Sequence, residues 1–326
     1  MFQLSEITWL HWTGFLGAVL FFLALDLGVF HRKAHVVRFR EAMGWTTVWF
    51  VLAMLFAFLI VPNDPAKGWI SGPRSEFITG YILELSLSMD NVFVIALIFG
   101  YFQVRLEYQH RVLFWGILGA LIMRGIMIGL GAALVHKFGW VLYVFGGFLL
   151  LTGVKMLFSD DDGVHPEKNP VVRLARRFFP ISKDFDGQNF TTRVAGRLML
   201  TPLALVLIVV ETTDLVFAVD SIPAIFGVTQ NSFIVFTSNV FAILGLRSLY
   251  FALAGMIGYF RFLKVGLSVV LIYIGAKMLG VIWGWKVPIN VSLGIVVGII
   301  ALSIIVSLVA ARWTRQEKQA DTLKRD

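Results

Sequence analysis

The 326-residue sequence contains no cysteine, and this absence removes several classes of chemistry. Without thiols the chain forms no disulfide and no thiolate metal site, so any metal must be held mainly by oxygen ligands. The sequence also lacks a P-loop, so we expect no ATP-driven activity. No Lys or Arg lies between Met1 and Glu6, which excludes the basic start of a cleaved signal peptide and predicts a retained first helix.

Apolar residues are abundant instead: they make up 58% of the chain, and the mean hydropathy is +0.82. These values are typical of membrane proteins rather than of soluble domains. We therefore expect an all-α polytopic membrane protein in which residues 1–326 form a single transmembrane domain. Runs of about 20 apolar residues predict nine spanning helices. They lie near residues 9–31, 43–62, 77–101, 112–135, 139–158, 198–226, 233–257, 265–284 and 288–311.

The positions of the basic residues predict how the chain is oriented. The net charge of +8 alone could suggest a nucleic-acid partner. Most Lys and Arg residues, however, lie after the first, third, fifth and seventh predicted helices and in the tail at 312–326. Because basic loops stay in the cytoplasm, this distribution places the N-terminus outside and the C-terminal tail inside. We expect contact with a lipid bilayer and no nucleic-acid partner.

One long polar segment, residues 159–197, interrupts the apolar runs and is predicted to be a cytoplasmic loop. Within it, Val171, Leu174 and Phe178 recur at helical spacing, and arginines occupy the other face. That pattern predicts a short helix lying on the membrane surface.

An internal repeat flanks this loop, with residues 77–158 as the first copy and 198–284 as the second. Three landmarks recur at offsets of 124, 123 and 122 residues: Asp90 and Asp214, Arg124 and Arg247, and Lys155 and Lys277. Each copy holds three predicted helices, numbers 3–5 and 6–8. Because three is odd, the second copy enters the membrane in the opposite sense, as in secondary transporters with inverted repeats. The two lysines lie near helix ends, where we expect them to reach the interface.

Five carboxylates lie in the first helices of the two copies and predict an ion site, because a charge at bilayer depth costs a few kcal/mol. They are Glu84, Asp90, Glu211, Asp214 and Asp220. Further polar groups nearby are Ser88, Asn91, Ser221 and Asn239. Pro223 cannot donate a hydrogen bond to Val219, so we expect the helix to kink or unwind around residues 219–221. We centre the metal on Asp90, Glu211, Asp214 and Asp220.

The ligand types suit Mn²⁺, Mg²⁺ or Ca²⁺, because the two acidic segments offer oxygen and neither Cys nor His. The acids outnumber Arg124 and Arg247, which we interpret as counter-charges. A divalent cation together with a proton would neutralise the excess, and this predicts exchange of metal for protons. In the alternative interpretation, the acids pair with the arginines for structural reasons and no ion is transported.

At these residues the chain resembles the TerC/Alx family of bacterial membrane proteins, which is related to LysE-like exporters. The segments that carry the resemblance are Gly80–Glu84, Ser88–Phe93, Phe145–Met156, Asp214–Phe226 and Thr237–Arg247. The resemblance implies an inner-membrane location, Mn²⁺ export and an association with tellurite resistance. It also implies that the five acids are the positions that matter for manganese.

We therefore expect a secondary exporter of Mn²⁺ that exchanges it for protons. The alternative is a non-transporting membrane scaffold or stress-response component, linked to tellurite resistance, whose buried acids are structural. An enzyme is disfavoured, because there is no cysteine and all six histidines fall at predicted helix ends or in loops.

Overall fold

Apolar helices make up most of the computed structural model, which describes residues 9–25, 39–61, 72–158, 170–182, 184–194, 196–253, 262–285 and 287–323. The elements in chain order are α1 (Trp9–Leu25), α2 (Phe39–Leu59), α3 (Pro73–Tyr101), α4 (Leu106–Lys137), α5 (Val141–Phe158), α6 (Pro170–Phe178), β1 (Thr191–Val194), β2 (Arg197–Leu200), α7 (Pro202–Phe226), α8 (Ser232–Leu253), α9 (Leu263–Gly280), the 3-10 turn η6 (Val281–Trp283) and α10 (Ile289–Leu323).

The helices confirm an all-α polytopic membrane protein. Eight of those in the described ranges are long and apolar enough to cross a membrane, and they coincide with predicted helices 2–9. The described part of the first predicted helix, α1, is also apolar but shorter, at 17 residues. Its predicted continuation over residues 26–31 falls outside the described residues.

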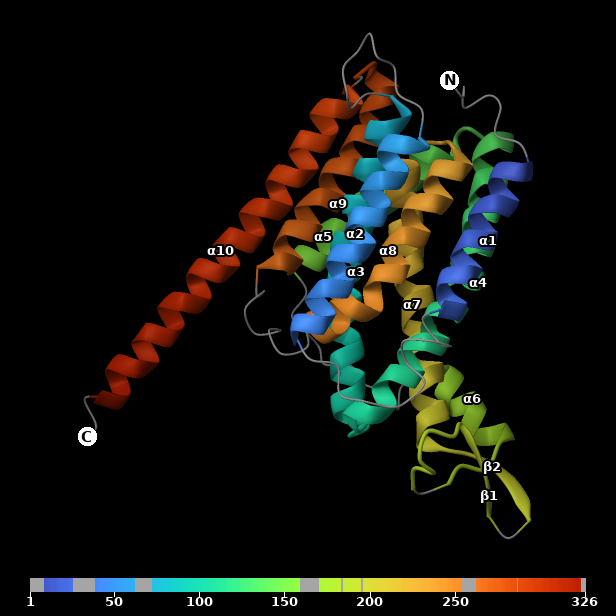
Figure 1. The fold of residues 1–326 in the computed structure, drawn as a ribbon. Helices are drawn as coiled ribbons and strands as arrows, with labels where there is room; N and C mark the ends of the chain where they lie inside the picture. Colours follow the sequence, from blue (N-terminus) through green and yellow to red (C-terminus); the bar gives the residue numbers. More distant parts are fainter. Residues whose placement is uncertain are drawn as a thin grey trace.

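Different elements lie at the two ends of the helix bundle. Figure 1 shows the start of α1 at one end, and α6 with the β1–β2 hairpin at the other. Helix α10 finishes at the same end as α6, and its C-terminal half extends away from the bundle (Figure 1). The predicted tail from residue 312 is thus a continuation of α10 as far as Leu323. Which end faces the cytoplasm remains a prediction.

Three helix pairs pack extensively and join the two predicted copies: α3 packs on α8, α4 on α7, and α5 on α9. The tightest approach is between α5 and α9, where glycines bring the two backbones together. A Cβ added to Gly153 would lie 2.8 Å from Ile272, and one added to Gly275 would lie 2.7 Å from the backbone nitrogen of Leu150. Both glycines and both partners are 122 residues apart, so the contact is reciprocal. Such reciprocity supports the inverted repeat, which remains a prediction.

The connection between the two predicted copies contains more structure than the sequence suggested. Helix α6 confirms the short helix, whereas the antiparallel pairing of Thr191–Val194 with Arg197–Leu200 was not foreseen. The prediction of a helix from residue 198 is therefore wrong for residues 198–200. Helix α7 begins at Pro202, where Thr201 caps it by accepting a hydrogen bond from the backbone of Ala204. Residues 159–169, which begin the predicted loop, lie outside the described residues.

The predicted unwinding near Pro223 does not occur. Helix α7 is helical without interruption from Pro202 to Phe226, including residues 219–221. Proline removes only the hydrogen bond to the carbonyl of Val219, and it stands close to the end of the helix. The segment from Ser221 to Phe226 is buried against neighbouring helices, and this packing holds the last turn in place.

Candidate functional site

Arg124 on α4 lies at the centre of a buried polar cluster. Its Nε and Nη2 atoms donate to the two carboxylate oxygens of Asp214 on α7, at 3.1 and 2.9 Å. Its Nη1 atom donates to Glu84 Oε1 on α3 and lies 3.5 Å from Ser221 Oγ. One guanidinium group therefore joins carboxylates from the first helix of each predicted copy, and all three of its nitrogens are engaged.

Burial makes this pairing important for folding. Arg124 is 1% exposed and Glu84 is fully buried, while the side chain of Asp214 is 11% exposed. A buried ion pair is costly to break, because removing one partner leaves the other charge uncompensated. The sequence-based prediction that Arg124 is a counter-charge to the acids agrees with this geometry.

Several buried side-chain oxygen and nitrogen atoms have no hydrogen-bond partner, and one of them is a carboxylate oxygen of Glu84 in this cluster. In the described ranges these atoms are Glu84 Oε2, Ser88 Oγ, Glu211 Oε2, both amide atoms of Asn239, and the Tyr273 hydroxyl. Unpaired buried polar groups are rare in native structures and often mark bound water or ions. Apart from the tyrosine, all belong to residues that the sequence nominated for the ion site.

Glu211 occupies a position that only a glycine on the facing helix permits. It lies one turn before Asp214 on α7, and a Cβ added to Gly119 on α4 would overlap its carboxylate. The absence of a side chain at Gly119 therefore provides the space for the Glu211 carboxylate between α4 and α7.

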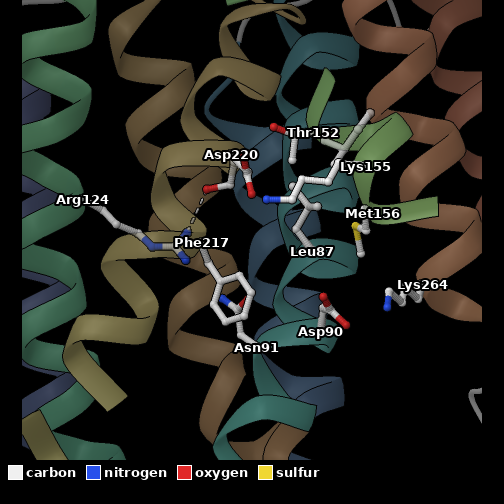
Figure 2. A pocket seen from close by; sticks show the side chains of 12 residues that line it. Leu87, Asp90, Asn91, Arg124, Thr152, Lys155, Met156, Phe217, Asp220 and Lys264 are labelled. Atoms are coloured by element: carbon white, nitrogen blue, oxygen red, sulfur yellow. Dashed lines mark hydrogen bonds between the residues drawn. The ribbon is translucent and has the colours of Figure 1, made fainter. Parts of the chain in front are cut away.

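A cavity of about 290 Å³ borders the cluster and is lined by the other two predicted acids, Asp90 and Asp220. Figure 2 shows the ammonium group of Lys155 pointing towards the carboxylate of Asp220, with Thr152 beside them. The Thr152 side chain hydrogen-bonds Asp220, and Lys155 interacts with it electrostatically.

Three basic residues share the lining of this cavity with its two acids. They are Arg124, Lys155 and Lys264, and Asn91 and Ser221 contribute polar groups. Lys155 lies in the last turn of α5, near a helix end as expected, and there it lines the cavity. Its reach to the membrane interface stays a prediction. Its spacing in the repeat marked it as notable, but no local pattern indicated Asp220 as its partner.

The five predicted acids do not converge on one point. Glu84 and Asp214 contact Arg124, Glu211 faces Gly119, and Asp90 and Asp220 line the cavity. Among the residues that the structure describes, no three His, Asp or Glu side chains are arranged to hold a metal ion. The arrangement predicted from sequence, with four acids around one metal, is thus not what the structure presents.

Arg247 on α8, the repeat partner of Arg124, lies in another environment. Its Nη2 atom is 2.6 Å from Nε2 of His110 on α4, and both residues are buried. The histidine was expected at a helix end or in a loop, but α4 begins at Leu106 and not near 112, so His110 lies within the helix. The structure thus shows the predicted counter-charge contact for Arg124 and a histidine contact for Arg247.

The chain is similar to several bacterial membrane proteins over nearly its whole length. It is 51% identical over 303 residues to an uncharacterized membrane protein of Myxococcus xanthus, covering 92% of each chain. It is 46% identical over 300 residues to the Escherichia coli K12 protein provisionally named membrane-bound redox modulator Alx, covering 91% of this chain and 93% of that protein. No solved structure matches it. Residues 72–319 match the family described as integral membrane protein TerC, and the chain therefore belongs to the TerC family.

Proposed function

We propose that this protein is a secondary transporter that exports a divalent metal cation across the bacterial inner membrane in exchange for protons, with Mn²⁺ as the cargo. The observation that carries the proposal is the group of buried, unpartnered atoms on Glu84, Ser88, Glu211 and Asn239. Carboxylate, hydroxyl and amide oxygens are ligands for Mn²⁺, and also for Mg²⁺ and Ca²⁺. A cation bound beside Glu84 and Glu211 would satisfy their unpartnered carboxylate oxygens.

The cavity beside the cluster supports a route for the cation. Asp90 and Asp220 line it, and Arg124 borders both the cavity and the buried carboxylates of Glu84 and Asp214. In this proposal the cation passes from the cavity towards those carboxylates. The acids of the cavity and of the cluster need not contact one ion at the same time, because alternating access moves the binding groups relative to one another.

The balance of charge supports exchange with protons. The five acids outnumber the nearby basic groups of Arg124, Lys155 and Lys264. Buried carboxylates that lack a cation are expected to take up protons to limit their electrostatic cost. A bound Mn²⁺ would then displace protons, and its release would allow them to return.

The proposed orientation follows the basic loops. We place the end of the bundle that carries α6, with its Arg176 and Arg177, in the cytoplasm, and the start of α1 outside. Export would then run from the end that carries α6 towards the end at which α1 begins.

Transport by purified protein tests the proposal. Proteoliposomes that contain the full-length chain and a pH-sensitive dye should take up Mn²⁺ when a proton gradient is imposed, with protons moving in the opposite direction. Vesicles without protein provide the baseline. If the protein moves no Mn²⁺ under gradients of either direction, the proposal is contradicted.

A non-transporting scaffold or stress-response component is the second candidate. The ion pairs of Arg124 with Glu84 and Asp214 favour it, because these contacts have the geometry expected of ion pairs that only stabilise the fold. The described residues also contain no ready-made group of metal ligands. The same flux measurement separates the two candidates, because a scaffold moves neither Mn²⁺ nor protons.

The name of the Escherichia coli relative mentions redox modulation. This chain has no cysteine, so a redox role could not use its own thiols. We propose no enzymatic activity.

Gly119→Ala tests the role of Glu211 without changing its charge. The new methyl group would overlap the Glu211 carboxylate, which can move aside because it is the end of a flexible side chain. We expect Mn²⁺ transport to fall by about tenfold while thermal stability changes little, because displacing a ligating group by about 1 Å weakens its interactions. Gly129→Ala on the same helix is the control, since a Cβ there has nothing within 4 Å. Equal transport by the two variants would argue against a role for Glu211.

A further inference from the structure

The position of Arg124 suggests a role beyond that of a static counter-charge. Its guanidinium group donates to carboxylates of Glu84 and Asp214 and also forms part of the cavity wall. Resting on the function proposed above, we propose that Arg124 is a tethered competitor of the transported cation. It occupies the carboxylates when the cation is absent and withdraws towards the cavity when the cation binds.

The first step of the argument is that Arg124 and a cation need the same oxygens. Both oxygens of Asp214 accept hydrogen bonds from Arg124, and so does Oε1 of Glu84. Only Oε2 of Glu84 is left without a partner there. A metal ion requires several direct oxygen ligands at short distance, so it competes with the guanidinium for the carboxylates of Asp214 and Glu84.

The second step concerns charge. Arg124 brings one positive charge to two carboxylates, and Glu211 adds a third carboxylate one turn away from Asp214. The pairing therefore leaves an excess of negative charge in a buried region. A divalent ion neutralises more of this charge than the guanidinium does, so exchange of one for the other is electrostatically favourable.

The third step is that a cavity next to Arg124 can accept its displaced guanidinium group. This cavity has a volume of about 290 Å³, and its lining includes the acids Asp90 and Asp220 together with the lysines Lys155 and Lys264. Arg124 and Phe217 both line the cavity, and Figure 2 shows the side chains around it. A rotation of the long Arg124 side chain would keep the guanidinium near negative charge after it leaves Asp214.

This role predicts that weakening Arg124 strengthens cation binding. Mn²⁺ binding is measured on the full-length protein in detergent, from the electron paramagnetic resonance signal of free Mn²⁺. Arg124→Gln removes the competing charge, and we expect its Mn²⁺ affinity to rise by about tenfold or more while its rate of Mn²⁺ release falls. Arg124→Lys keeps one charge but cannot bridge two carboxylates, and we expect an increase of about threefold. Loss of an arginine with only a structural role would instead leave the Mn²⁺ affinity unchanged or lower it.

Arg74→Gln is the matched control. Arg74 also joins two helices, since its side chain on α3 donates to the backbone carbonyls of Ala57 and Phe58 on α2. We expect this variant to bind Mn²⁺ with wild-type affinity. A gain in affinity confined to Arg124 variants would then reflect removal of a competitor and not general loosening of the bundle.

The outcomes are distinguishable. If folded Arg124→Gln protein binds Mn²⁺ with wild-type or weaker affinity while the wild type binds and transports it, the competitor role is overturned and the proposed transport function stands. If Arg124→Gln does not fold, Arg124→Lys decides, and wild-type or weaker affinity in that variant overturns the role. If the wild type neither binds nor transports Mn²⁺, the proposed function fails and this inference fails with it.

Discussion

Replacing Asp214 with asparagine is expected to reduce Mn²⁺ transport by about tenfold or more, equivalent to at least about 1.4 kcal/mol on the rate-limiting step. Asp214 accepts two hydrogen bonds from Arg124 and lies one turn from Glu211, so its charge is central to the cluster. Asparagine preserves the shape and one acceptor oxygen, but it removes the negative charge that attracts either the guanidinium or a cation. Mn²⁺ flux into proteoliposomes measures the change.

The protein should still fold in this variant, because Arg124 retains its contact with Glu84. Asp186→Asn is the control, since Asp186 is exposed in the connection that precedes α7 and lies outside the spanning helices. It should transport at the wild-type rate. Wild-type Mn²⁺ affinity and flux in Asp214→Asn would remove this residue from the site.

The second large effect concerns stability and lies at the contact between α5 and α9. Gly275→Ala is expected to destabilise the protein by about 1–3 kcal/mol, because overpacking displaces neighbouring groups. The new Cβ would lie 2.6 Å from the carbonyl oxygen of Gly146 and 2.7 Å from the backbone nitrogen of Leu150. These are backbone atoms, so the clash cannot be relieved by rotating a side chain. A fall in the thermal unfolding midpoint in detergent is the expected observation.

Gly147→Ala provides the comparison, because it adds the same methyl group to the facing helix at a site with nothing within 4 Å. Alanine also favours helix more than glycine does, by about 1 kcal/mol, so the unfolding midpoint of this variant should stay the same or rise. If the two variants unfolded at the same temperature, the close approach of α5 and α9 would not be important for stability.

Local sequence properties were sufficient to predict much of the helical architecture. Hydropathy along the chain located the spanning helices, because a helix that crosses lipid must satisfy its own backbone hydrogen bonds and present apolar side chains. The helix at Pro170–Phe178 could also be predicted, because its apolar and basic residues recur at helical spacing within a few turns. The hairpin that follows was missed, because its short strands alternate too few residues to give a clear signal.

The acids of the candidate site were also found from sequence, because a carboxylate in an apolar run is conspicuous. Of the two arginines, Arg124 could be predicted as a counter-charge, and the structure shows it against Glu84 and Asp214. The contact of Arg247 with His110 could not be predicted, because it depends on where α4 begins and on how α4 and α8 are rotated against each other.

The sequence by itself determined that this is a helical membrane protein with acids in two of its apolar helices. Only the tertiary structure decided how those acids are divided: Glu84 and Asp214 contact Arg124, while Asp90 and Asp220 line a cavity with Lys155. The physical reason is that ionic contacts act over a few ångströms between residues that are far apart in the chain. Their partners are fixed by the depth and rotation of packed helices, which no local pattern contains.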